Sequence, residues 1–490
     1  MSAWALGAVV LGGCAAEPGP FTPWLSEHPD RPIVFESPTG DDGAGVDAGE
    51  SSAARSMIGR SADAAIVPAD ASAEDYVGLA MARNPRLIAA RAEVERMRSA
   101  AEGAGWLDDP MLTFGVGDMA ETAAGRMAFT TGISQKFPLP EKLSRRRELA
   151  EERAVEAEAR LREARVALAA ETRRAFWNLY GVQRAIETTR TGRALLADLA
   201  AAVEARVRAG TADQQDLLRT TTELARLDGD LIDLAQRRAS AAAMLNTLID
   251  RPTGSPLPDP PIVDPPPTPD EPDDGSVDSR WFAAHPELDA IRAAIERHRH
   301  ELRLARLDDW PDLTIGLNYA AVDDEGLAGS ANGDDQAWVQ LGVNLPIWRE
   351  PRLAARRQAI AGIKQQLARL NDRQLRIEYR AADALARVRS QRRLVELFDE
   401  RILPDARRTV DLAVTQYGAA AGPFLDVIDH WRTLLDYELM QHRNIVQLRV
   451  AEADLTEAIG RTAIGGVEGR APGGGDIDSN EGGRGDEGSR

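Results

Sequence analysis

The sequence contains a single cysteine, Cys14, among 490 residues. One thiol excludes a disulfide within the chain and a metal site built from several cysteines. Aromatic residues make up only 5% of the chain, and it has no apolar run of about 18 residues, the length that marks a transmembrane helix. Lys and Arg number 59 against 78 Asp and Glu, a formal net charge of −19 that argues against a nucleic-acid partner.

Signatures of catalysis and cofactor binding are also missing. Two of the six histidines, His298 and His300, are two positions apart, so on a helix they cannot share a face. We expect both to lie on a solvated helix surface and to bind no metal. The run Gly473-Gly474-Gly475 lies in a polar tail and is not a phosphate-binding loop. The sequence therefore predicts neither an enzyme nor a cofactor.

Four landmarks occur twice in the same order, about 200 residues apart, which indicates a duplicated unit. Each copy predicts a helix, two short strands, one very long helix and a return helix. The landmarks are Asn84-Pro85-Arg86-Leu87 with His285-Pro286-Glu287-Leu288, Asp108-Asp109-Pro110-Met111-Leu112 with Trp310-Pro311-Asp312-Leu313, Ile133-Ser134-Gln135-Lys136-Phe137-Pro138 with Leu341-Gly342-Val343-Asn344-Leu345-Pro346, and Arg208-Ala209-Gly210 with Gln416-Tyr417-Gly418.

The first copy is expected over residues 71–250. A helix begins near Ala73 with Ser72 as its N-cap and runs to about Gly105. Two stretches between 111 and 137 alternate apolar and small or polar residues, as strands do. Residues 142–208 contain no proline, and at about 1.5 Å per residue they predict roughly 100 Å of helix. The chain turns at Gly210 and returns as a second helix, so we expect a long antiparallel hairpin.

The second copy is expected over residues 278–464. Its helix lies near 278–306, its strands between 313 and 345, and its long helix at 353–417, where Pro404 should interrupt the helix. A return helix follows from Phe424. The segments outside the copies have the compositions of linkers and tails. They are a flexible tether at 15–70, a proline-rich linker at 251–277 and a disordered tail at 465–490.

The N-terminus resembles a bacterial lipoprotein signal, residues 1–14. A short apolar run ends in Leu11-Gly12-Gly13-Cys14, and such signals place small residues before a cysteine that becomes lipidated. The residues before the run include no Lys or Arg, where a signal peptide normally has one. A misplaced start codon explains this difference, and so does an apolar N-terminus that is incidental.

The four predicted strands would form a sheet with open edges that must be paired. One face of each strand is apolar, and aromatic residues of the kind that gather at membrane interfaces flank the strands. These are Trp106, Phe137, Trp310 and Trp348. Four strands from each of three chains would close a twelve-stranded barrel in which every backbone group is satisfied in lipid. The alternative is a soluble sheet capped by helices.

The duplicated motifs resemble those of TolC-like outer-membrane efflux proteins, over about residues 73–462. The residues that carry the resemblance are Asn84-Pro85-Arg86-Leu87, Asp108-Asp109-Pro110, Ser134-Gln135-Lys136-Phe137-Pro138-Leu139-Pro140, Gly210 with Asp216-Leu217-Leu218, Leu245-Asn246, and Phe424-Leu425-Asp426-Val427-Ile428-Asp429. The resemblance implies a mainly α fold with a small β part, a trimer, a barrel in the bacterial outer membrane and a long periplasmic α-helical barrel. Glu141 departs from the glycine that relatives commonly have after Pro-Leu-Pro.

The resemblance also assigns roles at the hairpin tips. Gly210 and Gly418 would form the turns that contact a periplasmic adaptor protein. Asp426 and Asp429 are three apart and share a helical face. Acids at this position in relatives constrict the pore, and a ring of three carboxylates favours cations. Asp213 and Asp216 are weaker candidates for the same place. The alternative is that all of them are solvated acids on a helix flank.

The sequence thus predicts a lipid-anchored outer-membrane exit duct with most of its mass in the periplasm. An adaptor and an energised inner-membrane pump would be its partners. The Pro-Leu-Pro-Glu-Lys segment resembles ducts of heavy-metal cation pumps, although drugs or other small molecules stay open as substrates. A structural coiled-coil scaffold lipoprotein that spans the envelope is the alternative, and an enzyme is a distant third.

Overall fold

The computed structural model describes residues 67–116, 121–122, 125–261, 285–323, 333–419 and 421–462. Cys14, the signal and the C-terminal tail at 465–490 lie outside the described residues, as do most of the tether and part of the linker. In chain order the elements are α3 (Ala73–Arg83), α4 (Pro85–Gly103), β1 (Met111–Val116), β2 (Glu121–Thr122), β3 (Gly125–Phe137), α5 (Pro140–Arg208), α6 (Gln214–Leu248), α7 (Pro286–Leu307), β4 (Leu313–Asp323), β5 (Gln336–Val343), α8 (Arg349–Leu397), a π-helical segment (Phe398–Ile402), α9 (Leu403–Gly418) and α10 (Phe424–Ala458).

The single helix expected from Ala73 to Gly105 is two helices, α3 and α4. The break falls at Asn84, because the ring of Pro85 disfavours a helical conformation of the residue before it. Asn84 has φ −58° and ψ 125°, and its Oδ1 accepts a hydrogen bond from the Arg86 amide as the N-cap of α4. Ser72 caps α3 as expected, in a reciprocal capping box with Asp75.

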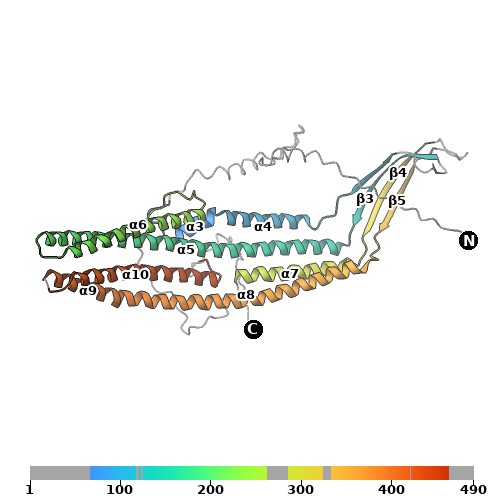
Figure 1. Cartoon of the computed structure of the whole chain (residues 1–490). Coiled ribbons are helices and arrows are strands. Elements are labelled where there is room, and N and C mark those ends of the chain that lie inside the picture. Colours follow the sequence, from blue (N-terminus) through green and yellow to red (C-terminus); the bar gives the residue numbers. More distant parts are fainter. Residues whose placement is uncertain are drawn as a thin grey trace, which may run out of the picture. The chain divides into compact units, whose positions relative to one another are not determined.

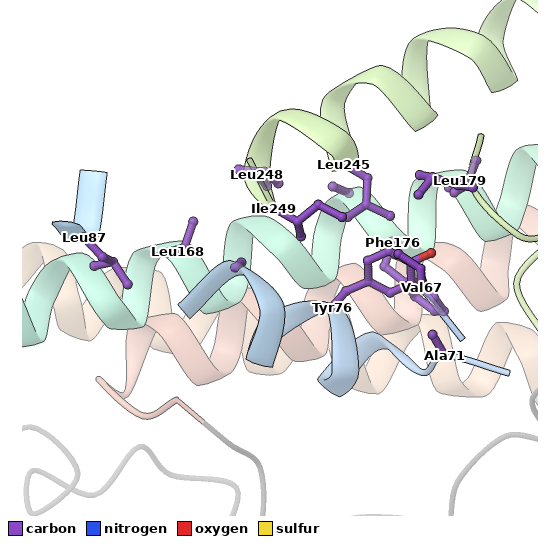
Figure 2. Close-up of a cluster of buried hydrophobic side chains, with 13 residues drawn as sticks. Val67, Ala71, Tyr76, Leu87, Leu168, Phe176, Leu179, Leu245, Leu248 and Ile249 are labelled. Carbon is purple, nitrogen blue, oxygen red and sulfur yellow. The ribbon is translucent and has the colours of Figure 1, made fainter. Parts of the chain in front are cut away.

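α5 is the central helix of the first half and spans 69 residues. It packs against α3, α4 and α6, and also against α7 and α10 of the second half (Figure 1). Where α3 and the end of α6 meet α5, buried apolar side chains form a cluster with the rings of Tyr76 and Phe176 at 5.5 Å (Figure 2). Burial of this kind stabilises by about 1.5 to 3 kcal/mol for each large side chain.

The long helix expected at 353–417 begins earlier, at Arg349, and is divided by the π-helical segment Phe398–Ile402. Pro404 explains the division because it has no amide hydrogen to donate to the preceding turn. The Leu403 amide instead donates to the Phe398 carbonyl, five residues back. α9 and α10 then form the second hairpin, and α10 packs against both α8 and α9 (Figure 1).

The strands form one antiparallel sheet in the order β1-β3-β4-β5, with the short β2 paired to β3. The sequence predicted four strands, whereas the described residues contain five, because β2 and the start of β3 form a small extension of the first hairpin. β3 and β4 join the two halves over a long register that runs from Arg126 opposite Asp323 to Phe137 opposite Leu313. The outer strands β1 and β5 are the edges of the sheet.

Charged side chains join the two halves along α5. Arg174 Nη1 lies 2.8 Å from Asp454 and 2.7 Å from Glu457 of α10. Nearer the sheet, the largely buried Glu156 accepts a hydrogen bond of 2.9 Å from Arg297 of α7. Within the described ranges, none of the helices combines the length and the apolar character needed to cross a membrane.

Candidate functional site

One face of the sheet is apolar and exposed on all four long strands. Paired registers place Leu112 beside Ile133, Ile133 beside Leu317, and Leu317 beside Val339. Exposed side chains of this row include Leu112, Phe114, Val116, Ile133, Phe137, Leu313, Ile315, Leu317, Tyr319, Val339, Leu341 and Val343. Soluble monomers rarely expose so continuous an apolar surface, so this face is a candidate membrane or partner contact.

The opposite face carries small and polar side chains. In register across the strands lie Thr113, Gly132 and Asn318, with Trp338 of β5 at the end of the row. Asn318 donates to the side chain of Gln340, and a Cβ on Gly132 would lie 2.3 Å from Asn318 Oδ1. The period-2 alternation expected from the sequence therefore separates an apolar face from a polar one.

The four aromatic residues expected to flank the strands lie at the same end of the sheet, where strands meet helices. Trp106 and Trp310 precede β1 and β4, while Phe137 ends β3 and Trp348 caps α8. Trp106, Trp310 and Trp348 are 60–77% exposed, and Phe137 is 38% exposed. Exposed indoles on one border of an apolar face are typical of a membrane interface.

A buried ion cluster joins the two halves at this border. Lys142 of α5, 4% exposed, donates from Nζ to Asp312 Oδ1 at 2.6 Å and to the Trp310 carbonyl at 2.7 Å. Lys136 Nζ lies 3.0 Å from the other oxygen of Asp312. The Asp312 amide donates to the side chain of Asn344, which follows β5. Burial alone raises the pKa of Asp312, but the hydrogen bonds from the two lysines outweigh it and lower that pKa below its usual value.

The tips of the two hairpins are built differently. Gly210 adopts φ +73° between α5 and α6, a conformation that favours glycine. Gly418 was expected to have the same role, but it ends α9 and has no positive φ. Its turn therefore does not require glycine at that position. A Cβ added at either glycine would meet nothing within 4 Å, so both tips are open on their outer side.

The acids of the tips lie near the starts of the return helices, with Asp426 in the first turn of α10 and Asp429 in its second turn. Asp426 and Asp429 are both exposed on α10, and Arg432 lies 3.7 Å from Asp429. In the first hairpin, Asp213 is the N-cap of α6 and accepts a hydrogen bond from the Gln215 amide, so its role there is structural. Asp216 lies in the first turn of α6, and burial followed by repulsion from Asp213 raises its pKa.

Contacts between the two hairpins near the tips were not foreseen from the sequence. Glu223 of α6 is 1% exposed, and its carboxylate contacts Arg226 at 2.7 Å and Arg432 of α10 at 2.6 Å. Arg206 of α5 donates to the Tyr417 carbonyl and lies 4.6 Å from the centre of the Tyr417 ring. Glu223 lies three residues after buried Thr220 and four before buried Leu227, so helical spacing places it on the interior face of α6, but the spacing does not reveal which distant helix it faces.

The expectation of solvated histidines on α7 was wrong. His298 is partly buried with Nδ1 2.7 Å from Glu301, and its ring lies against Gly362 of α8. His300 points to the other neighbour, with Nδ1 3.1 Å from Glu148 of α5. The two side chains are two positions apart and therefore enter different helix interfaces. In the part of the chain that the structure describes, no three His, Cys, Asp or Glu side chains gather as a metal site.

Comparison with known proteins agrees with this architecture. A family model described as outer membrane efflux protein matches residues 76–250 and 279–461. No curated protein sequence matches the chain.

Solved structures extend the likeness over most of the chain. CusC, whose structures concern folding and transmembrane channel formation, has a TM-score of 0.67 at 17% identity over 80% of this chain and 92% of its own. The outer membrane protein VceC of Vibrio cholerae has a TM-score of 0.66 at 16% identity over 79% of this chain and 96% of its own. The open MtrE channel of Neisseria gonorrhoeae has a TM-score of 0.64 at 18% identity, over 80% of this chain and 89% of its own.

Proposed function

This chain belongs to the outer membrane efflux protein family, and we propose that three copies of it form the exit duct of a tripartite export pump. Small molecules or metal cations would leave the periplasm through the duct passively, while an inner-membrane partner supplies the energy. The observation that carries this proposal is the amphipathic sheet with its two open edges. In lipid, each backbone N–H or C=O group of β1 and β5 that makes no hydrogen bond would cost roughly several kcal/mol. A strand from another copy would supply those hydrogen bonds.

A shared twelve-stranded barrel follows from four long strands in each of three copies. The apolar face would contact lipid, the polar face would line the passage, and the belt of Trp106, Phe137, Trp310 and Trp348 would lie at the membrane border. The helices would continue the passage through the periplasm. Neither role requires a resident cofactor.

The test of the barrel uses its resistance to unfolding by detergent. Before boiling, a barrel shared by three copies should migrate on a dodecyl sulfate gel as the intact trimer, above the position of the single chain, and boiling should convert it to the chain of 53.1 kDa. The protein should also be recovered in the outer-membrane fraction. A structural coiled-coil scaffold, the alternative function, has no barrel and would migrate identically under both conditions. Identical migration would therefore favour the scaffold.

The acids at the tips of the hairpins would form the periplasmic mouth. Three copies of exposed Asp426 and Asp429 would place six carboxylates around one aperture, with Asp216 as a further contributor. Such a ring attracts cations and repels anions. Attraction by the carboxylates suits metal cations, which are one candidate substrate class. The same attraction would be felt by any other cation that passes through the aperture.

Recording in a planar bilayer tests the aperture. Replacing Asp426 and Asp429 together by alanine should remove block by divalent cations while the trimer still assembles. The control is Asp411→Ala, which removes an exposed acid of α9 outside the proposed ring. A double variant blocked as strongly as the wild type would show that these aspartates are ordinary surface acids.

The open tips around Gly210 and Gly418 would contact the periplasmic adaptor. A bulky residue at either tip, such as Gly418→Trp, should weaken adaptor capture without changing the oligomeric state. If the variant captured the adaptor as well as the wild type does, the adaptor would contact another part of the protein.

Lipidation at Cys14 would add a second anchor beside the barrel. A clickable palmitate should label the wild type and leave Cys14→Ser unlabelled. Equal labelling of both would end the proposal of a lipid anchor and leave that of the duct unchanged.

A further inference from the structure

An open cavity of about 390 Å³ lies beside α7, where that helix packs between α5 and α8 (Figure 1). Sites for small molecules have volumes of about 300 to 1,000 Å³, so this cavity is large enough to hold a small ligand. α7 contributes Glu287 and three apolar side chains to it, while α5 and α8 contribute charged and polar ones. We call it the α7 cavity.

Most charged groups that line the α7 cavity already have partners. Glu156 accepts a hydrogen bond of 2.9 Å from Arg297. Glu287 accepts one of 2.9 Å from Arg380 and lies 3.4 Å from Arg373. The remaining ion pairs are Arg160 with Glu156 and Asp372 with Arg376. These groups would have to give up an existing pair to bind a ligand.

Three polar side chains of the α7 cavity make no hydrogen bond or ion pair with any described residue. They are a carboxylate, an amide and a guanidinium, namely Glu163 of α5 and Gln366 and Arg369 of α8. Gln366 is only 8% exposed, and a side-chain amide buried to this extent normally has a partner. Glu163 is partly buried and Arg369 is exposed. The cavity therefore leaves one acid, one base and one buried amide available to a ligand.

Glu163 lacks a cation close enough to form an ion pair. Burial, and then repulsion from Glu287, raise the pKa of its carboxyl above the usual value, while the nearby arginines act in the opposite direction. Those arginines are engaged by Glu156 and Glu287. An ammonium group placed at Glu163 would gain a charge-assisted hydrogen bond without breaking an existing pair.

Arg369 supplies the opposite charge from α8. Between α5 and α8, the α7 cavity is lined by the apolar side chains of Ala290, Ile291 and Ala294. An aliphatic chain would contact this surface while a carboxylate at its end bonds the guanidinium, which binds carboxylates through two parallel hydrogen bonds. A ligand that carries both charges neutralises Glu163 and Arg369 together and adds no net charge to the cavity.

We propose that the α7 cavity binds a small zwitterion, with its ammonium group at Glu163, its carboxylate at Arg369 and its aliphatic chain against α7. The ligand class is an amino acid whose two charged groups are separated by methylene groups. Gln366 would hydrogen-bond either end, because an amide both donates and accepts. All of these residues belong to one copy of the chain, so the site does not depend on the proposed ring of three.

The first test varies the distance between the two charges of the ligand. The probes are β-alanine, γ-aminobutyrate, δ-aminovalerate and ε-aminocaproate, which differ only in the number of methylene groups. In calorimetric titrations of the detergent-purified protein, affinity should be highest at one chain length, because both ends must reach their partners. The best probe should bind about tenfold more tightly than the amine or the acid of the same chain length, each of which lacks one charged contact.

The second test assigns each end of the ligand to its side chain. Glu163→Gln should remove the preference for the best zwitterion over the matching acid, and Arg369→Gln should remove the preference over the matching amine. Each change should weaken binding of the zwitterion about tenfold. Arg357→Gln is the matched control, because Arg357 is an exposed arginine of α8 outside the cavity, and it should bind like the wild type.

The outcomes separate this inference from the proposed function. Absence of binding, equal affinity along the series, or Glu163 and Arg369 variants that bind like the wild type would each overturn the zwitterion site. The export duct would stand in all three cases, because its tests measure the barrel and the trimer. Helical circular dichroism equal to that of the wild type confirms that a variant with weakened binding is still folded.

Discussion

At the residue scale, the structure depends on a few polar side chains buried between the two halves. Asp312 is the clearest case, since it bonds the side chains of Lys142 and Lys136 and its own amide bonds Asn344. Removing one member of a buried ion pair costs more than removing both, because the remaining charge stays buried without a partner.

Asp312→Asn should therefore destabilise the protein by about 3 to 5 kcal/mol. Lys142→Met combined with Asp312→Leu should cost less than Asp312→Asn alone, because no buried charge is left. The stability of both variants can be measured from the loss of the helical circular dichroism signal on heating. Arg86→Ala is the control, since its pair with Glu171 at 3.0 Å is largely exposed and should contribute no more than about 1 kcal/mol. If the combined variant were less stable than Asp312→Asn, the cluster would not act as an ion pair.

His285 makes stability depend on pH. Its Nδ1 accepts a hydrogen bond from the Glu287 amide as the N-cap of α7, which requires the neutral ring, and burial lowers its pKa below the usual value. The native state thus binds fewer protons than the unfolded state. The contribution to stability is complete above the unfolded pKa of about 6.5 and is lost as pH falls below it.

The chain itself supplies the matched variant, because Asn84 caps α4 at the equivalent place in the first half. His285→Asn should keep a cap at every pH and reduce the loss of stability between pH 7.5 and pH 5 by about 1 kcal/mol. Thermal midpoints across that range give the measurement. His442, whose pKa is lowered by burial and by Arg184, remains in both proteins and cancels in the comparison. If the thermal midpoints of the wild type and His285→Asn changed in parallel with pH, His285 would not be the source of the pH dependence.

At the element scale, the distance between α5 and α10 is set by glycine. A Cβ on Gly181 would lie 2.6 Å from Val446 Cγ2, and one on Gly192 would lie 3.2 Å from Leu435. Valine is stiff because it is branched at Cβ, so it cannot turn away from the added methyl group. At both glycines of α5, side chains of α10 therefore lie too close for a larger residue to fit without a shift.

Gly181→Ala should destabilise the protein by about 1 to 3 kcal/mol through overpacking, although alanine is the better helix former. Gly229→Ala in α6 is the control, because nothing lies within 4 Å of its Cβ. That change should stabilise by roughly 0.5 to 1 kcal/mol. Thermal unfolding of the two variants should thus move in opposite directions, and a gain for both would contradict the close packing.

At the scale of the whole molecule, β1 and β5 are the edges of the described sheet, and its apolar face is exposed, with 80% of Val116 accessible. A trimer that shares one barrel, as proposed above, would cover both features. Mass measurement of the detergent-extracted protein, corrected for bound detergent, should give a trimer. A clean monomer would remove the argument for a shared barrel.

Much of this fold could be predicted from residues close together in the sequence. The alternation of the strands, the cap at Ser72 and the interruption at Pro404 all follow from local geometry. The break at Asn84 was missed, although the proline that causes it is equally local, because the apolar period continues across it. The family could be recognised because its motifs occur twice in one order.

The tertiary structure decided what depends on residues far apart. Lys142 and Asp312 are 170 positions apart, and no local pattern shows that a lysine will be buried against that aspartate. Glu223 and Arg432 are 209 positions apart and were likewise unforeseen. The sequence determines which residues are helical, extended or apolar, because those properties act over a few residues. A buried charge needs a partner because packing removes the water that would otherwise solvate that charge. Which residue becomes the partner is decided only when distant helices pack together.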